Sequence, residues 1–308
     1  MALRRQNSGP AAASHEASAS LLAQLSALGI HPKKGLGQNF LVDPAHRAHI
    51  VAAAELSRDD TVLEVGPGPG MLTELIAEQA GRVIAVELDD RLIPFLRKRF
   101  AGQPLVSIVH ADILKVDVGA LMTIDDRPLT IDSESIVHRP SSTVRYKVIA
   151  NLPYYLTSAV IRQLLESTPS PERLVLTVQR EVAERMVAAP PDMSLLALGV
   201  QFYCTASIVE RIPAGAFYPA PKVDSAAVRL DRRPEPAVPG VTSEAFFRVA
   251  RAGFSQPRKQ LRNSLAGGLG KSPVTVEAWL AASGIDPRRR AESLTLIEWG
   301  VLALSPVS

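Results

Sequence analysis

From residue 44 onward, short apolar segments typical of strands alternate with segments that have the periodicity of helices. Strands are predicted at residues 61–65, 82–86, 106–110, 147–150 and 174–178. Helices are predicted at residues 44–56, 71–80, 91–100, 157–167 and 181–189. Strands separated by helices form parallel sheets with right-handed crossovers, and two β-rich stretches within residues 208–230 suit an antiparallel end. The pattern therefore predicts an α/β fold with a mostly parallel sheet.

Composition divides the chain into parts on either side of a boundary near residue 231. Residues 1–20 are rich in Ala and Ser, and we predict a disordered N-terminal segment, although their arginines also suit an organelle transit peptide. Residues 21–231 are predicted to form the main domain. A Pro-rich linker at 232–240 follows, so residues 241–308 are predicted to form a small helical domain. Its helix patterns lie at residues 243–266, 274–283 and 293–304.

One polar segment interrupts the alternation of the main domain. Residues 118–146 are long for a loop in a compact domain. We interpret them as an insertion that is functional or mobile, or that holds a short hairpin.

The composition excludes several classes of protein. Cys204 is the only cysteine, so the chain has no internal disulfide and no multi-cysteine metal site. No apolar run reaches the roughly 18–20 residues that a membrane helix needs, and the N-terminus lacks a secretory apolar core. We therefore expect a cytoplasmic protein. The histidines lack metal-ligand spacing, so no metal is predicted. The net charge of +3 and the pI of about 9.1 favour a polyanionic partner.

Three predicted strand ends carry groups that suit a nucleoside-like ligand. The first strand runs into a turn with glycines at alternate positions, Gly66, Gly68 and Gly70, which lets backbone approach a ligand. The next two strands end at Glu87 and Asp112, which suit ribose hydroxyls and an adenine amine. These two acids could instead cap the following helices.

The details of this site discriminate between cofactors. A dinucleotide site has the spacing Gly-x-Gly-x-x-Gly, which is absent here, so a nicotinamide dehydrogenase is disfavoured. Acidic Glu64 and Glu87 suit a cationic ligand better than a phosphorylated one. The sequence therefore predicts S-adenosylmethionine, whose sulfonium is cationic.

Residues 151–154 (NLPY) have the groups needed to hold an exocyclic amine and its ring. The Asn151 side-chain oxygen and a nearby backbone carbonyl can both accept hydrogen bonds from an amine. Pro153 fixes its own φ, and Tyr154 offers a flat face on which a base can stack. Asn-x-Pro is also ordinary turn chemistry, so the motif alone leaves both interpretations open.

Five motifs together resemble the small-subunit ribosomal RNA adenine dimethyltransferases. They occur in family order at residues 35–41 (GLGQNFL), 64–70 (EVGPGPG), 151–154 (NLPY), 179–185 (QREVAER) and 217–225 (FYPAPKVDS). The resemblance implies a Rossmann-like class I methyltransferase fold. It also implies dimethylation at N6 of two adjacent adenines in the 3′-terminal hairpin loop of 16S-type RNA, within an immature small subunit, by a protein that we expect to be monomeric.

The resemblance and the strand-end pattern together assign cofactor contacts. The resemblance implies that Gln38 and Asn39 belong to a segment that folds over the cofactor. The predicted cofactor-binding residues are Gln38, Asn39, Leu41, Glu64, Gly66, Gly68, Glu87, Asp112 and Asn151. The chain departs from the family in two places. Residues 190–193 (PPDM) replace a usual Tyr-Gly pair, and the insertion at 118–146 is longer than is typical.

The predicted chemistry places the target adenine against the NLPY motif. Asn151 and the carbonyl of Leu152 or Pro153 would accept hydrogen bonds from N6, and Tyr154 would stack on one face of the base. Phe217 is the candidate for the other face, or else a core residue.

Basic residues in three motifs are candidates for RNA contact. We predict a helical segment over residues 255–263, where a cluster of basic side chains would straddle phosphates, although a solvated helix face is the alternative. The predicted RNA-binding residues are Arg180, Arg185, Lys222, Arg258, Lys259 and Arg262.

Two other functions stay open at this point. The nearest rival enzyme is the related 23S adenine methyltransferase that confers macrolide resistance. A second rival is a non-catalytic role as a ribosome-assembly or transcription-factor-like binder. Residues 221–225 (PKVDS) and Leu152 favour the 16S-type enzyme, and the intact NLPY motif argues against loss of catalysis.

Overall fold

A computed structural model describes residues 10–122 and 145–305. The chain forms two compact units. The first holds the described residues up to Arg180 together with Ile208–Arg229, and the second holds Glu181–Ser207 and the described residues from Leu230 onward. Within the described residues, no helix has the length and apolar character that a membrane crossing requires.

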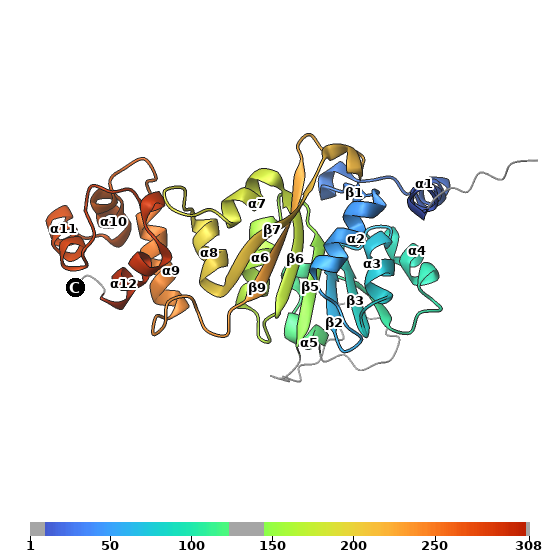
Figure 1. The fold of residues 1–308 in the computed structure, drawn as a ribbon, viewed down its shortest axis with the longest axis horizontal. Coiled ribbons are helices and arrows are strands. Elements are labelled where there is room, and N and C mark those ends of the chain that lie inside the picture. The colour runs from blue at the N-terminus through green and yellow to red at the C-terminus, as the bar shows by residue number, and fades with distance from the viewer. Residues whose placement is uncertain (1–9, 123–144, 306–308) are drawn as a thin grey trace, which may run out of the picture. The chain divides into compact units, whose positions relative to one another are not determined.

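A seven-stranded sheet with the order β4-β3-β2-β5-β6-β9-β7 organises the fold (Figure 1). The strands are β2 (Thr61–Val65), β3 (Arg82–Glu87), β4 (Val106–His110), β5 (Tyr146–Asn151), β6 (Arg173–Gln179), β7 (Cys204–Ile212) and β9 (Ser225–Arg232). The five strands from β4 to β6 are parallel, as predicted. Val65 pairs with both Val86 and Ala150, so the carboxyl ends of three strands meet at one edge. The predicted strand positions are confirmed to within one residue from β2 to β6.

Helices and a small second sheet complete the first unit. Asp43 caps α2 (Pro44–Ala53) by accepting from the N–H groups of Ala45 and His46, and Pro44 occupies its first turn. Further helices of this unit are α3 (Met71–Ala77), α4 (Leu92–Arg99) and α6 (Thr157–Glu166). Strand β1 (Phe40–Leu41) pairs antiparallel with β8 (Phe217–Tyr218), which joins two segments that are far apart in the sequence.

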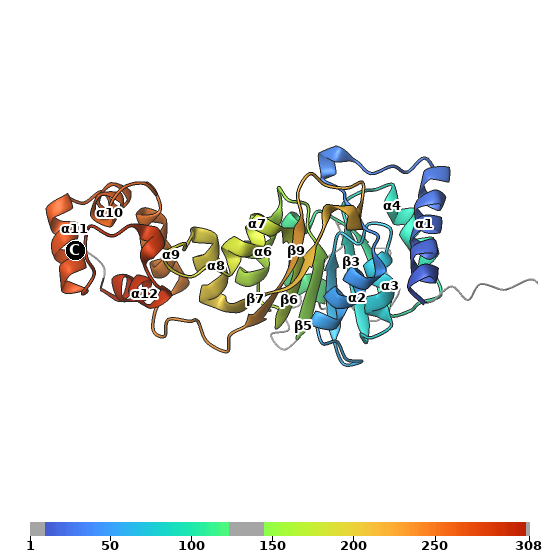
Figure 2. The same ribbon diagram turned by 45° about the horizontal axis from the view of Figure 1, so that its top comes forward.

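The predicted disorder of residues 1–20 is wrong for residues 10–20. They belong to helix α1 (Pro10–Ala27), which Figure 2 shows along its length. Leu21 and Leu25, one helical turn apart, are buried in the hydrophobic core of the first unit. The buried guanidinium of Arg47 also donates to the Ser18 hydroxyl at 2.8 Å. The Ala-rich composition that suggested disorder also favours helix, and Leu21, Leu25 and the Ser18 hydroxyl hold this helix on the first unit. Residues 1–9 lie outside the described residues.

The predicted insertion at residues 118–146 differs from the structure at its two ends. Its first residues form helix α5 (Val118–Met122), whose Val118 and Leu121 are buried, and Tyr146 begins β5. Residues 123–144 lie outside the described residues.

The second unit is helical but its boundaries differ from those predicted. It contains α8 (Leu195–Tyr203), α9 (Ser243–Gly253), α10 (Leu261–Leu269), α11 (Pro273–Ala282) and α12 (Leu296–Leu304), with α7 (Arg180–Met186) entering it. Phe202 of α8 packs on Phe246 of α9 with ring centroids 4.6 Å apart. Residues 181–207 therefore belong to this unit and not to the main domain. The Pro-rich linker showed where the chain changes composition, but not that α8 buries its apolar face against α9.

The single helix predicted over residues 243–266 is two helices. The chain leaves the helical conformation after Gly253 and re-enters it at Leu261. Pro257 lies between them and cannot donate a helical hydrogen bond. The predicted helical segment over residues 255–263 is wrong for residues 255–260, which include Arg258 and Lys259 and lie in this connection, and is confirmed for residues 261–263, which belong to α10.

Candidate functional site

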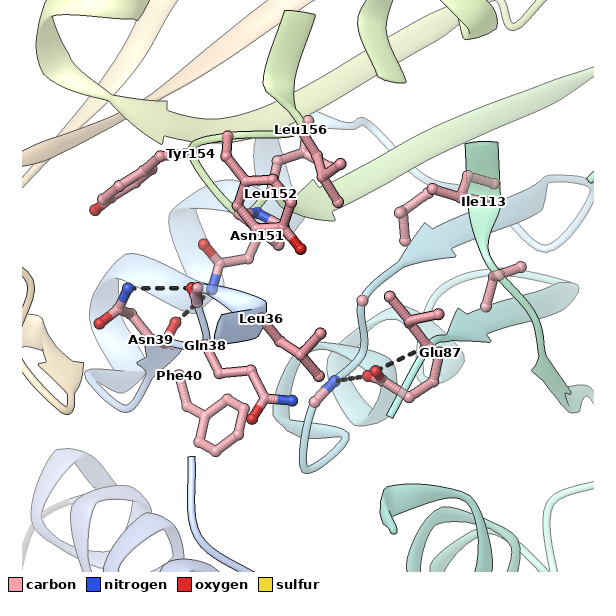
Figure 3. Close-up of a pocket in the computed structure, with 18 of the residues that line it drawn as sticks. Leu36, Gln38, Asn39, Phe40, Glu87, Ile113, Asn151, Leu152, Tyr154 and Leu156 are labelled. Carbon is pink, nitrogen blue, oxygen red and sulfur yellow. Dashed lines mark hydrogen bonds between the residues drawn. The ribbon is translucent and has the colours of Figure 1, made fainter. Parts of the chain in front are cut away.

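A pocket opens at the carboxyl ends of the parallel strands, where ligands of such sheets bind (Figure 3). About 800 Å³ of space lies between its lining residues, and this volume includes open solvent. The residues that line it come from the segment that leads into β1, from the ends of β2, β3 and β4, from the NLPY motif with the two residues after it, and from β8: Leu36, Gly37, Gln38, Asn39, Phe40, Val65, Gly66, Gly68, Val86, Glu87, Leu88, Ala111, Asp112, Ile113, Asn151, Leu152, Pro153, Tyr154, Tyr155, Leu156 and Phe217.

The glycine turn after β2 brings backbone to the floor of the pocket. Gly66 and Gly68 have φ values of 71° and 56°, which L side chains rarely adopt. A Cβ at Gly68 would also lie 2.9 Å from the Phe40 ring, so no side chain fits there. The Gly68 N–H donates to the carboxylate of Glu87 at 3.1 Å. The predicted role of these glycines in close backbone approach agrees with this geometry.

Glu87 is fixed at the end of β3 by backbone donors. One carboxylate oxygen accepts from the N–H groups of Leu88 and Asp89 at 2.9 and 2.8 Å, and the other accepts from Gly68. Burial raises the pKa of Glu87, although these three donors oppose the shift. These donors occupy both lone pairs of Oε1 and one of Oε2, so one lone pair of Oε2 remains for a ligand. The residue is thus an oriented acceptor that faces the pocket.

Asp112 both caps the helical turn that follows it and lies at the pocket, which are the two roles that the sequence left open. Its carboxylate accepts from the Leu114 N–H at 3.0 Å and so caps the short 3₁₀ turn Ile113–Lys115. The same residue lines the pocket. Capping fixes the carboxylate without removing it from the site.

Asn151 is oriented by the backbone of the segment before β1. Its side-chain nitrogen donates to the Asn39 carbonyl at 2.9 Å (Figure 3). A carboxamide has its donor and acceptor on opposite sides, so this bond assigns the oxygen to the acceptor role toward a ligand. Asn39 is held in turn, because its own side chain donates to the Gly37 carbonyl at 3.2 Å.

Two aromatic residues of the prediction line the pocket. The Tyr154 hydroxyl lies 3.1 Å from the Ser225 hydroxyl, which fixes the ring, and burial raises the pKa of this phenol. Phe217 is 5% exposed and belongs to the hydrophobic core of the first unit as well as to the pocket lining. Phe217 therefore packs in the core, as the alternative predicted, and also lies at the pocket, where its predicted contact with a base could form.

Two predicted cofactor contacts lie outside the pocket lining. Leu41 is buried in β1, opposite Phe217, and packs in the core. Glu64 is buried within β2, and among the described residues neither of its carboxyl oxygens has a hydrogen-bond partner. Burial raises the pKa of Glu64 to about 8; the nearby Thr73 hydroxyl opposes this shift and the charge of Glu87 adds to it. The assignment of Glu64 to a cationic ligand stays a prediction, and its burial and raised pKa count against it.

Sequence reasoning missed several lining residues, which fall into two groups. The first flanks predicted residues at strand ends and in the NLPY motif: Val65, Val86, Leu88, Ala111, Ile113, Tyr155 and Leu156. Their positions beside Glu87, beside Asp112 and after Tyr154 were the only sequence signal that could have identified them as lining residues. The second group, Leu36, Gly37 and Phe40, lies within the motif at residues 35–41.

The predicted RNA-binding residues are divided between the two units. In the first, Lys222 is exposed and Arg180 pairs with Asp224 at 3.3 Å. In the second, Arg185 is exposed on α7.

The other predicted RNA contacts lie in the connection before α10 and in its first turn. Arg258 and Lys259 are exposed in the connection. Arg262 lies in the first turn of α10 and pairs with Glu277 at 3.0 Å, and its contact with RNA stays a prediction. Within the two described ranges, no cluster of three or more His, Cys, Asp or Glu residues could hold a metal ion.

Comparisons with known proteins give one consistent result. A family model described as "Ribosomal RNA adenine dimethylase" matches residues 30–299. The chain is 45% identical over 289 residues to a ribosomal RNA small subunit methyltransferase A of Dehalococcoides mccartyi, covering 92% of this chain and 93% of that protein. It is 41% identical over 289 residues to the protein of the same name in Moorella thermoacetica, covering 92% and 95%.

Two solved structures share the fold. A crystal structure of the 23S rRNA methyltransferase ErmE has a TM-score of 0.65 and 29% identity, covering 86% of this chain and 98% of that chain. A dimethyladenosine transferase from Plasmodium falciparum has a TM-score of 0.65 and 24% identity, covering 86% and 95%. The fold is thus similar to that of both a 23S methyltransferase and a dimethyladenosine transferase.

Proposed function

The chain belongs to the ribosomal RNA adenine dimethylase family, and from this premise we propose that it dimethylates N6 of two adjacent adenines in the 3′-terminal hairpin loop of 16S-type ribosomal RNA. The substrate would be an immature small subunit, and the reaction would take place in the cytoplasm. The observation that carries the proposal is the orientation of Asn151, whose side-chain nitrogen is bound to the Asn39 carbonyl, so that its oxygen is the acceptor available to an amine.

The pocket fits S-adenosylmethionine as the methyl donor. When bound, this cofactor supplies an electrophilic methyl group on its sulfonium. Glu87 would accept a hydrogen bond from a ribose hydroxyl through the one Oε2 lone pair that its backbone donors leave unused. Asp112, capped in place at the end of β4, would accept from the adenine amine of the cofactor. The Gly66–Gly68 backbone leaves room for the ligand because neither position has a side chain.

The acceptor amine needs two hydrogen-bond acceptors, because an adenine amine is a poor nucleophile while its lone pair is delocalised into the ring. The Asn151 side-chain oxygen is one of them. The Pro153 carbonyl already accepts from the Leu156 N–H at 3.0 Å and the Thr157 hydroxyl at 3.3 Å. We therefore assign the second acceptor to the Leu152 carbonyl. Two acceptors in fixed positions favour the pyramidal form of the amine, so the rate comes from positioning and electrostatics.

Aromatic side chains would hold the base itself. Tyr154, fixed by Ser225, offers a face for stacking on an adenine extruded from its loop. Phe217 lines the same pocket and is the candidate for the opposite face.

Methyl transfer with purified components tests this function against its two rivals. We expect labelled methyl groups from S-adenosylmethionine to appear as N6,N6-dimethyladenine in immature small subunits and not in protein-free 23S RNA. Label in the 23S RNA alone would favour the macrolide-resistance activity. Binding to the small-subunit particle without transfer would favour the non-catalytic role.

A further inference from the structure

Asp89 is a buried carboxylate to which the proposed chemistry gives no role. It is 1% exposed and does not line the pocket. One oxygen accepts from the Arg91 Nε at 2.9 Å and lies 3.4 Å from the Lys33 Nζ. The other accepts from the Arg91 Nη2 at 2.6 Å and from the Gln38 Nε2 at 3.0 Å. Burial alone would raise the pKa of Asp89, but the bonds from Arg91 and Gln38 outweigh it and hold the pKa well below its usual range.

These bonds hold one segment, residues 31–39, which crosses the pocket. Besides Lys33 and Gln38, the segment is tied through its backbone, because Arg91 donates to the His31 carbonyl at 3.2 Å. None of its side chains is fully buried, so hydrophobic packing contributes little to its position. The hydrogen bonds to the buried Asp89 carboxylate therefore restrain residues 31–39 more strongly than hydrophobic packing does.

The same segment fixes the acceptor amide on its other side. The Asn39 carbonyl accepts from the Asn151 side chain, one residue after Gln38. Gly37 packs closely on the NLPY motif, since a Cβ there would lie 3.2 Å from Pro153 and 3.4 Å from Tyr155. A continuous series of contacts thus runs from Asp89 through residues 37–39 to Asn151.

We propose that Asp89 is a positioning residue for methyl transfer, which holds residues 31–39 so that the Asn39 carbonyl keeps the Asn151 oxygen turned toward the acceptor amine. This inference rests on the proposed function. It makes Asp89 a determinant of turnover although the residue touches neither cofactor nor substrate.

A double-mutant cycle between Asp89 and Asn151 tests the proposal. We expect Asp89→Asn to lower kcat about ten-fold in the wild-type background and less than about two-fold in an Asn151→Ala background, because the two residues act through one path. Asp90→Asn is the matched control: Asp90 is exposed and lies 3.9 Å from Lys33, but it accepts none of the bonds to Gln38 or Arg91. It should leave kcat unchanged. Equal losses from Asp89→Asn in both backgrounds would overturn the proposal.

Amide hydrogen exchange supplies a readout that does not depend on activity. In the protein without ligands, Asp89→Asn should speed exchange of the amides at residues 36–40, and Asp90→Asn should not. Arg91→Ala, which removes the link to His31 and leaves the pocket lining intact, should give the same change if Asp89→Asn does not fold. Unchanged exchange in a folded Asp89→Asn or Arg91→Ala protein would contradict the proposal. Wild-type protein that transfers no methyl group would instead contradict the proposed function alone.

Discussion

Replacement of Asn151 by Ala is expected to lower kcat for methyl transfer by about 10²–10³-fold while the Kd for S-adenosylmethionine changes less than about three-fold. The side-chain nitrogen of Asn151 is committed to the Asn39 carbonyl, which leaves the oxygen as the acceptor for the reacting amine. That contact strengthens as the amine becomes pyramidal, so its loss falls on the transition state. Single-turnover transfer and calorimetric cofactor binding measure the two quantities separately.

Asn39→Ala is the control for this substitution. It removes the side-chain bond to the Gly37 carbonyl but keeps the backbone carbonyl that orients Asn151. We expect a smaller loss of kcat than in Asn151→Ala. If Asn151→Ala lowered cofactor affinity as much as turnover, Asn151 would chiefly hold the cofactor, and its role toward the amine would be wrong.

Glu64→Gln is expected to stabilise the ligand-free protein at pH 9 relative to the wild type, and to change stability little at pH 5. Burial raises the pKa of Glu64 from 4.5 to about 8. The folded state therefore binds this proton more tightly than the unfolded state, and wild-type stability falls as the pH rises from about 4.5 to about 8. Glutamine cannot ionise and removes this loss, which is on the order of 5 kcal/mol at most.

Urea denaturation at pH 5, 7 and 9 measures the effect of Glu64→Gln. Glu55→Gln is the control, because hydrogen bonds from Arg229 and Arg173 hold the pKa of Glu55 at about 2. Its contribution to stability is complete above about pH 4.5 and is lost only in acid, so its profile should run parallel to the wild type from pH 5 to 9. Parallel profiles for Glu64→Gln as well would show that Glu64 is ionised in the folded protein.

The parts of the site that sequence could predict are those set by local patterns. The β-branched runs before Gly66 and Glu87 fixed the strand ends, and the parallel register then placed Glu87, Asp112 and Asn151 at the same edge. Glycine spacing likewise predicted a turn at the end of β2 where backbone can approach a ligand, and Gly66 and Gly68 in this turn have the positive φ values that favour glycine.

The parts that sequence could not predict depend on contacts between distant residues. Asn39 and Asn151 are 112 positions apart, and Gln38 and Asp89 are 51 apart, so no local pattern links them. Glu64 was assigned to the ligand by its place beside the glycine turn, but the structure buries its side chain in the core. The second unit shows the same limit, because the packing of Phe202 on Phe246 crosses the Pro-rich linker.

A map of modified adenines in ribosomal RNA from a strain that lacks this protein tests its function most directly. We predict that the two adjacent N6,N6-dimethyladenines near the 3′ end of the 16S-type RNA disappear. The wild-type gene should restore both, and the Asn151→Ala gene should not. Small-subunit RNA that kept both modifications in the deletion strain, or a loss confined to the 23S RNA, would contradict the assignment.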